Sequence, residues 1–412
     1  MAVALIWIVS LASVALMLAR PRGIPEYVWV CGGAVLLVAG RLLPLASAGR
    51  AILDGVDVYL FLTGMMLLAE LAREEGVFDW VADIAVHHAR GSSGRLFLWI
   101  YGAGVLVTAL LSNDATAVVM TPAVLAALRR AKVEPRPHLL ACALIANAAS
   151  FLLPISNPAN LVVFDQHMPP LGRWLAVFLL PSAAAIGATF LCLRVICREP
   201  LRQRTAAVEE SYRLQPAGWL ALAAIAVAAI VLLVCSGFGI ALGAPTCAVS
   251  VVALALVAVR DRHAPRNAIR NVSWSVLPLV AGLFMIVEVL NRAGLMRLTR
   301  AGIGWAAALH NSLGRLTGGF AVGLLSNVMN NLPVGLAAGT ALRQMGHHGP
   351  LAEALMIGVD LGPNLSVTGS LATILWLIAL RREDAEITGW SFLKVGVVAM
   401  PVALALALLA LR

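Results

Sequence analysis

Apolar segments long enough to cross a lipid bilayer recur along the whole of this 412-residue chain. A membrane-spanning helix needs about 20 mostly apolar residues. The composition agrees, because 61% of the residues are hydrophobic and 12% are charged, against about 45–50% and about 25% in soluble domains. The sequence therefore predicts an all-α polytopic membrane protein.

Ten segments are predicted to span the membrane, and two others to enter it without crossing. The two exceptions, 96–128 and 313–342, are each interrupted halfway by a polar cluster. A straight helix of about 33 residues would measure about 50 Å, whereas the hydrocarbon core is about 30 Å thick. Each is therefore expected to be a re-entrant hairpin with its polar tip at membrane depth. The ten predicted spans are 2–19, 27–45, 56–72, 139–164, 174–193, 217–235, 238–259, 275–291, 351–380 and 392–411.

The basic residues favour this topology. With ten spans and two hairpins, most of the 30 Lys and Arg residues fall on one side of the membrane, and basic residues concentrate in cytoplasmic loops. The loops at 194–213, 260–270 and 381–382 are therefore expected in the cytoplasm, with both termini outside. No basic residue precedes the first apolar segment, so 2–19 is expected to be a retained span rather than a cleaved signal.

The chain is predicted to contain two inverted repeats. The spacing G-x5-E-x5-G that begins at Gly64 recurs from Gly282, and the string LLSN at 110–113 recurs at 324–327. Five spans per repeat is an odd number, so the second repeat would be inserted upside down. Inverted repeats with interrupted helices are typical of secondary transporters. The predicted units are the first repeat 1–197, a cytoplasmic linker 198–216 and the second repeat 217–412.

Four polar clusters interrupt the apolar segments at membrane depth. Two are the hairpin tips, and the others, 154–160 and 360–370, interrupt the fourth and ninth spans. Irregular polar backbone is tolerated there only where it is buried in protein or lines a water-filled cavity. Any one cluster could simply kink a helix or bridge two helices, but four in pseudo-symmetric positions favour one substrate site. The predicted substrate-binding residues are Ser112, Asn113, Thr116, Ser156, Asn157, Asn160, Ser326, Asn327, Asn330, Asn331, Asn364, Thr368 and Ser370.

Two carboxylates, Asp114 and Asp360, lie within these breaks. A charge at mid-membrane costs at least about 2.5–3.5 kcal/mol on insertion scales, and is a functional hypothesis by default. Both are predicted to carry the coupled proton; holding a cation or capping a helix are the alternatives. Glu70 and Glu288 lie nearer an interface and are expected to pair with a neighbouring Arg. Asn147 stands roughly where Asp360 stands in the other repeat, so only one repeat offers a titratable group at that level.

The sequence lacks the motifs that several functional classes require. No Walker-A loop of the form GxxxxGK[ST] and no HExxH sequence is present, so neither direct use of ATP nor a catalytic metal is expected, and no cofactor is predicted. The net charge of +9 is spread over short clusters between apolar runs, which disfavours nucleic acid as a partner. A membrane-embedded hydrolase would need a nucleophile and base beside the aspartates, and none is apparent. The chain is therefore expected not to be an enzyme.

Five stretches at or beside the breaks carry a family resemblance: GMMLLAELAREEGVFD (64–79), NDATAVVMTP (113–122), SNPANLVVF (156–164), SNVMNNLP (326–333) and GVDLGPNLSVTGSLATILWL (358–377). From about residue 50 to the carboxyl end, the chain resembles the arsenite and antimonite efflux permeases of the ion transporter superfamily. The resemblance implies an inner-membrane exporter of trivalent metalloid hydroxides, driven by proton exchange, working alone or with a soluble ATPase subunit. Sodium-coupled dicarboxylate carriers of the superfamily have SNT at both hairpin tips. Here the tips read SND and SNV, which favours the metalloid branch.

The residues in the breaks suit such a solute. Arsenous acid is a neutral trihydroxide near pH 7, and Asn, Ser, Thr and backbone groups can hydrogen-bond it without a basic side chain. The breaks contain no Lys or Arg. Cys142 is the sole cysteine near a break, so the cysteine-free protein is expected to export arsenite. The predicted partners are a small inorganic solute, protons and membrane lipid.

Two alternatives to metalloid export remain open. Helix amino ends can bind anions without basic side chains, so a sodium- or proton-coupled anion (dicarboxylate-like) transporter of the same fold is one. A passive channel lined by the two hairpins is the other, and uphill accumulation of a solute would exclude it.

Overall fold

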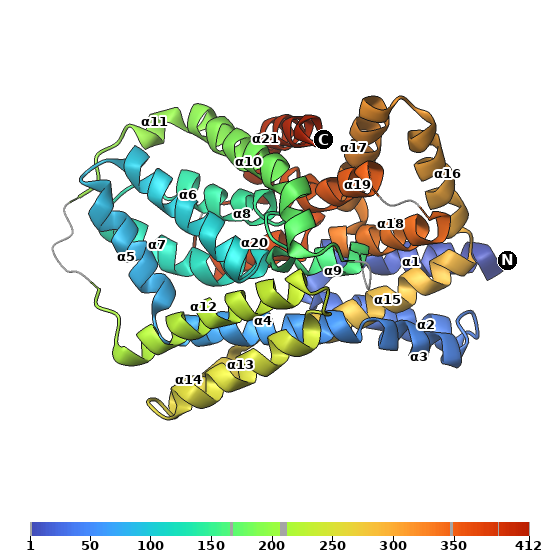
Figure 1. Cartoon of the computed structure of the whole chain (residues 1–412), viewed down its shortest axis with the longest axis horizontal. Helices are drawn as coiled ribbons and strands as arrows, with labels where there is room; N and C mark the ends of the chain where they lie inside the picture. Colours follow the sequence, from blue (N-terminus) through green and yellow to red (C-terminus); the bar gives the residue numbers. More distant parts are fainter. Residues whose placement is uncertain (1, 165–167, 207–211, 347–348, 386, 412) are drawn as a thin grey trace.

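The computed structural model describes residues 2–164, 168–206, 212–346, 349–385 and 387–411, and within them the regular elements are helices, without a β-strand (Figure 1). The all-α prediction is confirmed. The first half contains α1 (Ala2–Ala19), α2 (Glu26–Ala39), α3 (Leu45–Asp54), α4 (Val56–Glu74), α5 (Val77–Ala89), α6 (Ser93–Leu110), α7 (Thr121–Ala131), α8 (Arg136–Ala148), α9 (Pro158–Phe164), α10 (Leu171–Ile196) and α11 (Arg198–Leu201). The second half contains α12 (Pro216–Gly237), α13 (Gly243–Ala258), α14 (His263–Asn271), α15 (Val276–Arg292), α16 (Leu295–Ala308), α17 (Asn311–Met329), α18 (Asn331–Met345), α19 (Pro350–Leu361), α20 (Leu371–Arg382) and α21 (Gly389–Ala410).

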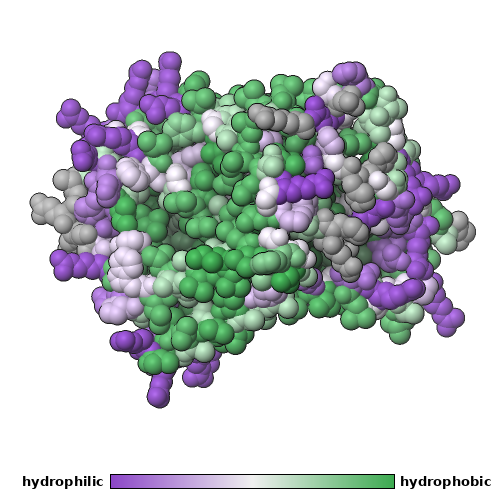
Figure 2. Space-filling view, viewed as in Figure 1, coloured by the Kyte–Doolittle hydropathy of each residue, from purple (hydrophilic) through white to green (hydrophobic). Residues whose placement is uncertain are grey.

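Several helices are long and apolar enough to cross a membrane. Within the described residues there are 6 by length and composition, or up to 7 if the pair α3 and α4, bent by 47°, is one span. On the face shown in Figure 2, hydrophobic residues cover the middle, and hydrophilic residues gather at the two ends of the long axis. A protein that crosses the bilayer along its long axis presents this distribution. The number of ten spans and the orientation of the termini stay predictions.

The segment from α6 to α7 runs toward the centre and returns. A break at 111–114 and a π-helical segment (Ala115–Met120) separate the two helices. The Ser93 amide donates to the Gln203 carbonyl at 3.1 Å, and the Ala206 amide donates to the Ala131 carbonyl at 2.8 Å. Both ends of the segment therefore lie against residues 203–206, at what we call the linker end of the molecule, on the left in Figure 1.

The opposite end of the long axis carries the amino terminus, and we call it the N-terminal end (Figure 1). The second predicted hairpin consists of α17 and α18, which meet at Asn330. Both helices pack on α16, so this segment also turns back on itself. Asn330 has φ +74° and ψ 151°, a backbone region that is almost confined to glycine.

The two halves interlock rather than form separate bodies. The helix α4 packs on α13 and α14, and α15 packs on α2 and α3. The helix α6 packs on α8, α17 packs on α19, and α10 packs on α21. That the two halves are repeats of one another stays a prediction. Whether the second half is inverted stays a prediction.

Paired glycines bring the second hairpin against the second broken span. A Cβ atom on Gly358 would collide with the backbone of Gly319, and one on Gly362 would collide with the backbone of Gly323. Small residues spaced four apart allow two helices to approach closely in membranes. The crossing of α17 and α19 therefore fixes the polar tip of the hairpin beside the break that follows α19.

Candidate functional site

Four helical segments begin at the polar breaks. At each start a side chain from the predicted set accepts a hydrogen bond from an amide of the first turn, which satisfies one of the free N–H groups there. The caps are Ser112, Asn157, Asn330 and Ser370, which accept from the amides of Ala115, Ala159, Leu332 and Thr373 at 3.2, 3.0, 3.4 and 3.2 Å.

These four helix starts surround one cavity of about 20 Å³, which we call the central cavity. Two side chains of α4 and α15, Leu62 and Val276, complete its wall. The volume is enough for about one water molecule, so a larger solute can enter only if the surrounding helices move. The predicted site residues that line it come from all four breaks and are Asn113, Asp114, Asn157, Asn331 and Ser370.

The central cavity combines positive helix ends with one carboxylate. Each helix amino end carries about half a positive charge and free N–H groups. Among the described residues that line the cavity, Asp114 is the sole ionisable one, and no Lys or Arg is present. Asp114 and Ser112 also line a neighbouring cavity of about 40 Å³ toward the linker end, with Met65 and Glu70 of α4. We call this the linker-side cavity. Asp114 therefore stands between two compartments.

Asp360 lies behind the wall of the central cavity. It is fully buried, with 0% of its surface exposed. Its Oδ2 accepts a hydrogen bond from the Ser150 hydroxyl at 2.6 Å, and its Oδ1 accepts one from Asn157 Nδ2 at 2.9 Å. Because Asn157 also lines the cavity, the protonation state of Asp360 can act on the cavity through one shared side chain. Ser150 is absent from the predicted set; its place between Asn147 and the break at 154–160 was the only signal for it.

Asn147 ties the two halves together, a role that its sequence position did not reveal. Its Nδ2 donates to Asn364 Oδ1 at 3.0 Å, and its Oδ1 accepts from the Ser370 hydroxyl at 3.4 Å. Asn364 Nδ2 donates to the Leu144 carbonyl at 2.9 Å. Asn364 is therefore occupied by partners from α8 and lies outside the central cavity.

Asn327 does not take the place that its repeat partner Asn113 takes. Its Nδ2 donates to the Gly362 carbonyl at 2.9 Å, and its Oδ1 accepts from the Ser366 amide at 3.0 Å. The Thr368 hydroxyl donates to the Asn327 carbonyl at 2.9 Å. These bonds hold the second hairpin to the second break. Asn331, four residues later, lines the cavity instead.

The remaining predicted residues support the breaks through bonds to the protein. The hydroxyls of Thr116 and Thr108 lie 2.8 Å apart. Asn160 Nδ2 donates to the carbonyls of Ser150, Leu153 and Pro154, at and just before the break at 154–160, the nearest being that of Ser150 at 3.0 Å. The hydroxyls of Ser156 and Ser326 donate to the carbonyls of Ala109 and Val322 at 3.2 and 3.0 Å.

The described part of the chain contains neither a cluster of metal-ligating side chains nor a paired cysteine. The described residues contain no group of three or more His, Cys, Asp and Glu side chains that could hold a metal ion. The six cysteines are free, and Cys142 is buried. Glu70 and Glu288 pair with Arg73 and Arg292 at 2.6 and 2.8 Å, which confirms the ion pairs expected for them.

Comparison with known proteins decides the family. The citrate transporter (CitMHS) model matches residues 3–359. An arsenical pump membrane protein of Yersinia enterocolitica is 30% identical over 369 residues, which cover 84% of each chain. One of Escherichia coli is 32% identical over 383 residues, also 84% of each chain. The chain belongs to the CitMHS family of transporters, and it is a relative of the arsenical pump membrane proteins.

Membership of this transporter family establishes the general function of the chain. The chain is a multi-pass transporter of the inner membrane and not an enzyme. The resemblance seen in the sequence is thereby confirmed. The crystal structure of the Alcanivorax borkumensis YdaH transporter has the same fold, with a TM-score of 0.59 and 16% identity over 93% of this chain and 96% of that one.

Proposed function

We propose that this transporter exports trivalent metalloid hydroxides, arsenite and antimonite, in exchange for protons. The observation that carries the proposal is the central cavity, where polar residues from four breaks surround a single carboxylate, Asp114. Relatives that are about 30% identical along most of the chain are named arsenical pump membrane proteins.

The chemistry of the cavity suits a neutral trihydroxide. The amides of Asn113, Asn157 and Asn331 and the hydroxyl of Ser370 can both donate to and accept from As–OH groups, and the helix amino ends add N–H donors. A citrate-like anion would bring several negative charges next to the Asp114 carboxylate, without a basic side chain to offset them. The neutral solute is therefore the better fit.

Exchange follows if the proton and the solute compete for the same carboxylate. The ionised Asp114 accepts a hydrogen bond from an As–OH group, and protonation removes most of that attraction. Each ligand then lowers the affinity for the other by the same factor. Asp360 acts in the same sense through Asn157: its protonation alters the bond from Asn157 Nδ2, and so changes the side chain that the solute meets.

We further propose that the units 1–197 and 217–412 are inverted repeats with re-entrant hairpins at 96–128 and 313–342. The position of Ser93 and Ala131 against the same loop supports the first hairpin. The two hairpins and two broken spans would move together past α4 and α15. This movement would carry the site from one face of the membrane to the other. The cytoplasm would lie at the linker end. A soluble ATPase subunit stays an expectation from the resemblance alone.

Everted membrane vesicles test the proposal. An acidic vesicle interior is expected to drive uphill uptake of arsenite, whereas a sodium gradient alone has no effect. Asp114→Asn and Asp360→Asn should each abolish the response to pH, while Glu199→Gln on the exposed helix α11 should respond like the native chain. Full pH-driven uptake by both aspartate variants, or uptake driven by sodium alone, would contradict the mechanism.

A further inference from the structure

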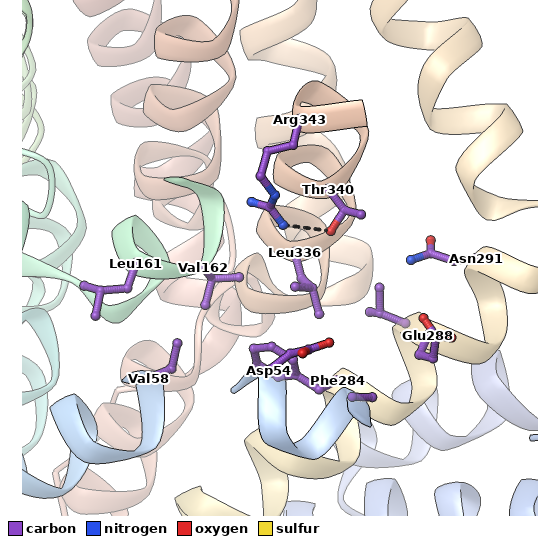
Figure 3. Close-up of a pocket in the computed structure, with 12 residues that line it drawn as sticks. Asp54, Val58, Leu161, Val162, Phe284, Glu288, Asn291, Leu336, Thr340 and Arg343 are labelled. Atoms are coloured by element: carbon purple, nitrogen blue, oxygen red, sulfur yellow. Dashed lines mark hydrogen bonds between the residues drawn. The ribbon is translucent and has the colours of Figure 1, made fainter. Parts of the chain in front are cut away.

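A larger cavity, about 220 Å³ in volume, lies between α3, α9, α15 and α18 (Figure 3). We call it the N-side cavity, because α3 and the carboxyl end of α15 lie toward the N-terminal end of the molecule. It is large enough for several water molecules. Its polar lining residues are Asp54, Glu288, Asn291, Thr340 and Arg343.

The N-side cavity continues the central cavity along the same helices. On α9, Pro158 lines the central cavity and Leu161 lines the N-side cavity. On α18 the corresponding pair is Leu332 and Leu336, which lie about one turn apart. A solute that leaves the central cavity toward the N-terminal end therefore passes these apolar side chains and enters the N-side cavity.

The charges around the N-side cavity are largely balanced. Glu288 pairs with Arg292 at 2.8 Å. Arg343 donates from Nη1 to the Val163 carbonyl at 3.1 Å and from Nη2 to the Thr340 hydroxyl at 3.2 Å. Asp54 is exposed at the end of α3. Gly55 follows it, and the ring of Tyr59 lies close to Gly55. The two carboxylates would repel an oxyanion, and the guanidinium of Arg343 would repel a bare cation.

Asn291 presents its amide group to the N-side cavity. Its Oδ1 is buried and has no hydrogen-bond partner among the residues that the structure describes, although buried polar atoms are nearly always paired. Figure 3 shows its amide group at the edge of the N-side cavity, on the same side as Glu288. Oδ1 has no surface open to the cavity, whereas the Nδ2 group points toward it (Figure 3), so a hydroxyl oxygen placed in the cavity can accept from Nδ2.

We propose that the N-side cavity is a second binding site for a neutral, hydroxyl-bearing solute. Its identity as arsenous acid rests on the proposed function, whereas the cavity itself rests on geometry. One hydroxyl group of the solute would donate to the Asp54 carboxylate, and another would accept from Asn291 Nδ2. The solute thus passes through two sites in series on the way out.

The linker-side cavity has no such site. The spacing that relates Glu70 to Glu288 relates Arg73 to Asn291, so the amide of Asn291 is replaced by a guanidinium that is already paired with Glu70. Its volume is about 40 Å³, and Met65, Met66 and Val118 fill much of its lining. The second site therefore belongs to one side only.

Equilibrium dialysis of the purified full chain against arsenite tests the inference. All six cysteines are replaced by Ser, so that thiols do not bind arsenic, and bound arsenic is measured by mass spectrometry. The Cys→Ser background is expected to bind two arsenite molecules per chain, and Asn291→Leu to bind one. Thr340→Val keeps the shape of the side chain and should weaken the second binding event several-fold. Asn267→Leu, on the exposed face of α14, is the matched control and should bind two.

The possible outcomes separate the two proposals. A single bound arsenite in the background, with the same number and affinity in Asn291→Leu and Thr340→Val, would overturn the second site and leave the central cavity in place. No binding to the background, together with no transport, would overturn the proposed function itself.

Discussion

At the scale of the residue, the site depends on which partner each polar group has. The buried Asp360 accepts two hydrogen bonds, from Ser150 and Asn157, and such bonds offset the cost of burying a carboxyl group. Asn291 Oδ1 has none among the described residues. Removal of a partner of Asp360 should lower the stability of the protein, whereas Asn291 Oδ1 has no described partner to lose. Each hydrogen bond of the site can therefore be tested by its own substitution.

Removal of the Ser150 hydroxyl should destabilise the protein measurably. Ser150→Ala leaves the buried Asp360 with one donor fewer, so the free energy of unfolding is expected to fall by about 1–3 kcal/mol. Thermal unfolding in detergent measures this. The control is Ser182→Ala, because Ser182 is fully buried and its hydroxyl has no partner in the described part of the chain. Equal losses from both substitutions would show that the Ser150–Asp360 bond contributes little.

At the scale of the element, the sequence predicted the breaks but not the direction of their side chains. Polar strings such as PISNPAN stand out because the flanking residues are apolar, and the four breaks do meet at one cavity. Which polar side chains face the cavity depends on contacts between segments distant in sequence. Asn113 and Asn327 occupy the same place in the repeated string LLSN, yet Asn327 bonds to Gly362 and Ser366. Periodicity carries no information on that choice.

The crossing of α17 and α19 should be intolerant of side chains. Gly358→Ala would place a Cβ atom against the backbone of Gly319, and overpacking of this kind costs about 1–3 kcal/mol. The same substitution would shift the second hairpin tip and lower transport. Thermal unfolding and vesicle uptake, measured together, check both effects.

The control for that crossing is Gly187→Ala on α10, where, among the described residues, the new Cβ would meet nothing within 4 Å beyond its chain neighbours and its own helix backbone. Ala is about 1 kcal/mol better than Gly in a helix interior, so this variant should be as stable as the native chain or slightly more so. If the two variants behaved alike, close approach would not be what fixes the hairpin.

At the scale of the whole molecule, three cavities follow one another along α4. Val58 lines the N-side cavity, Leu62 lines the central cavity and Met65 lines the linker-side cavity. Their volumes are about 220, 20 and 40 Å³, so the most spacious compartment lies toward the N-terminal end and the narrowest at the centre. Passage of a solute therefore requires the hairpins and broken spans to shift relative to α4 and α15.

The central claim is that arsenite and a proton compete for Asp114. Titration of arsenite into the purified, cysteine-free chain in weakly buffered solution, with a pH electrode, measures this competition directly. We predict that binding releases protons at mildly acidic pH, that the affinity rises as the pH is raised to neutral, and that Asp114→Asn releases fewer protons. Binding of equal affinity at both pH values, with no proton release by the unsubstituted chain, would contradict the account.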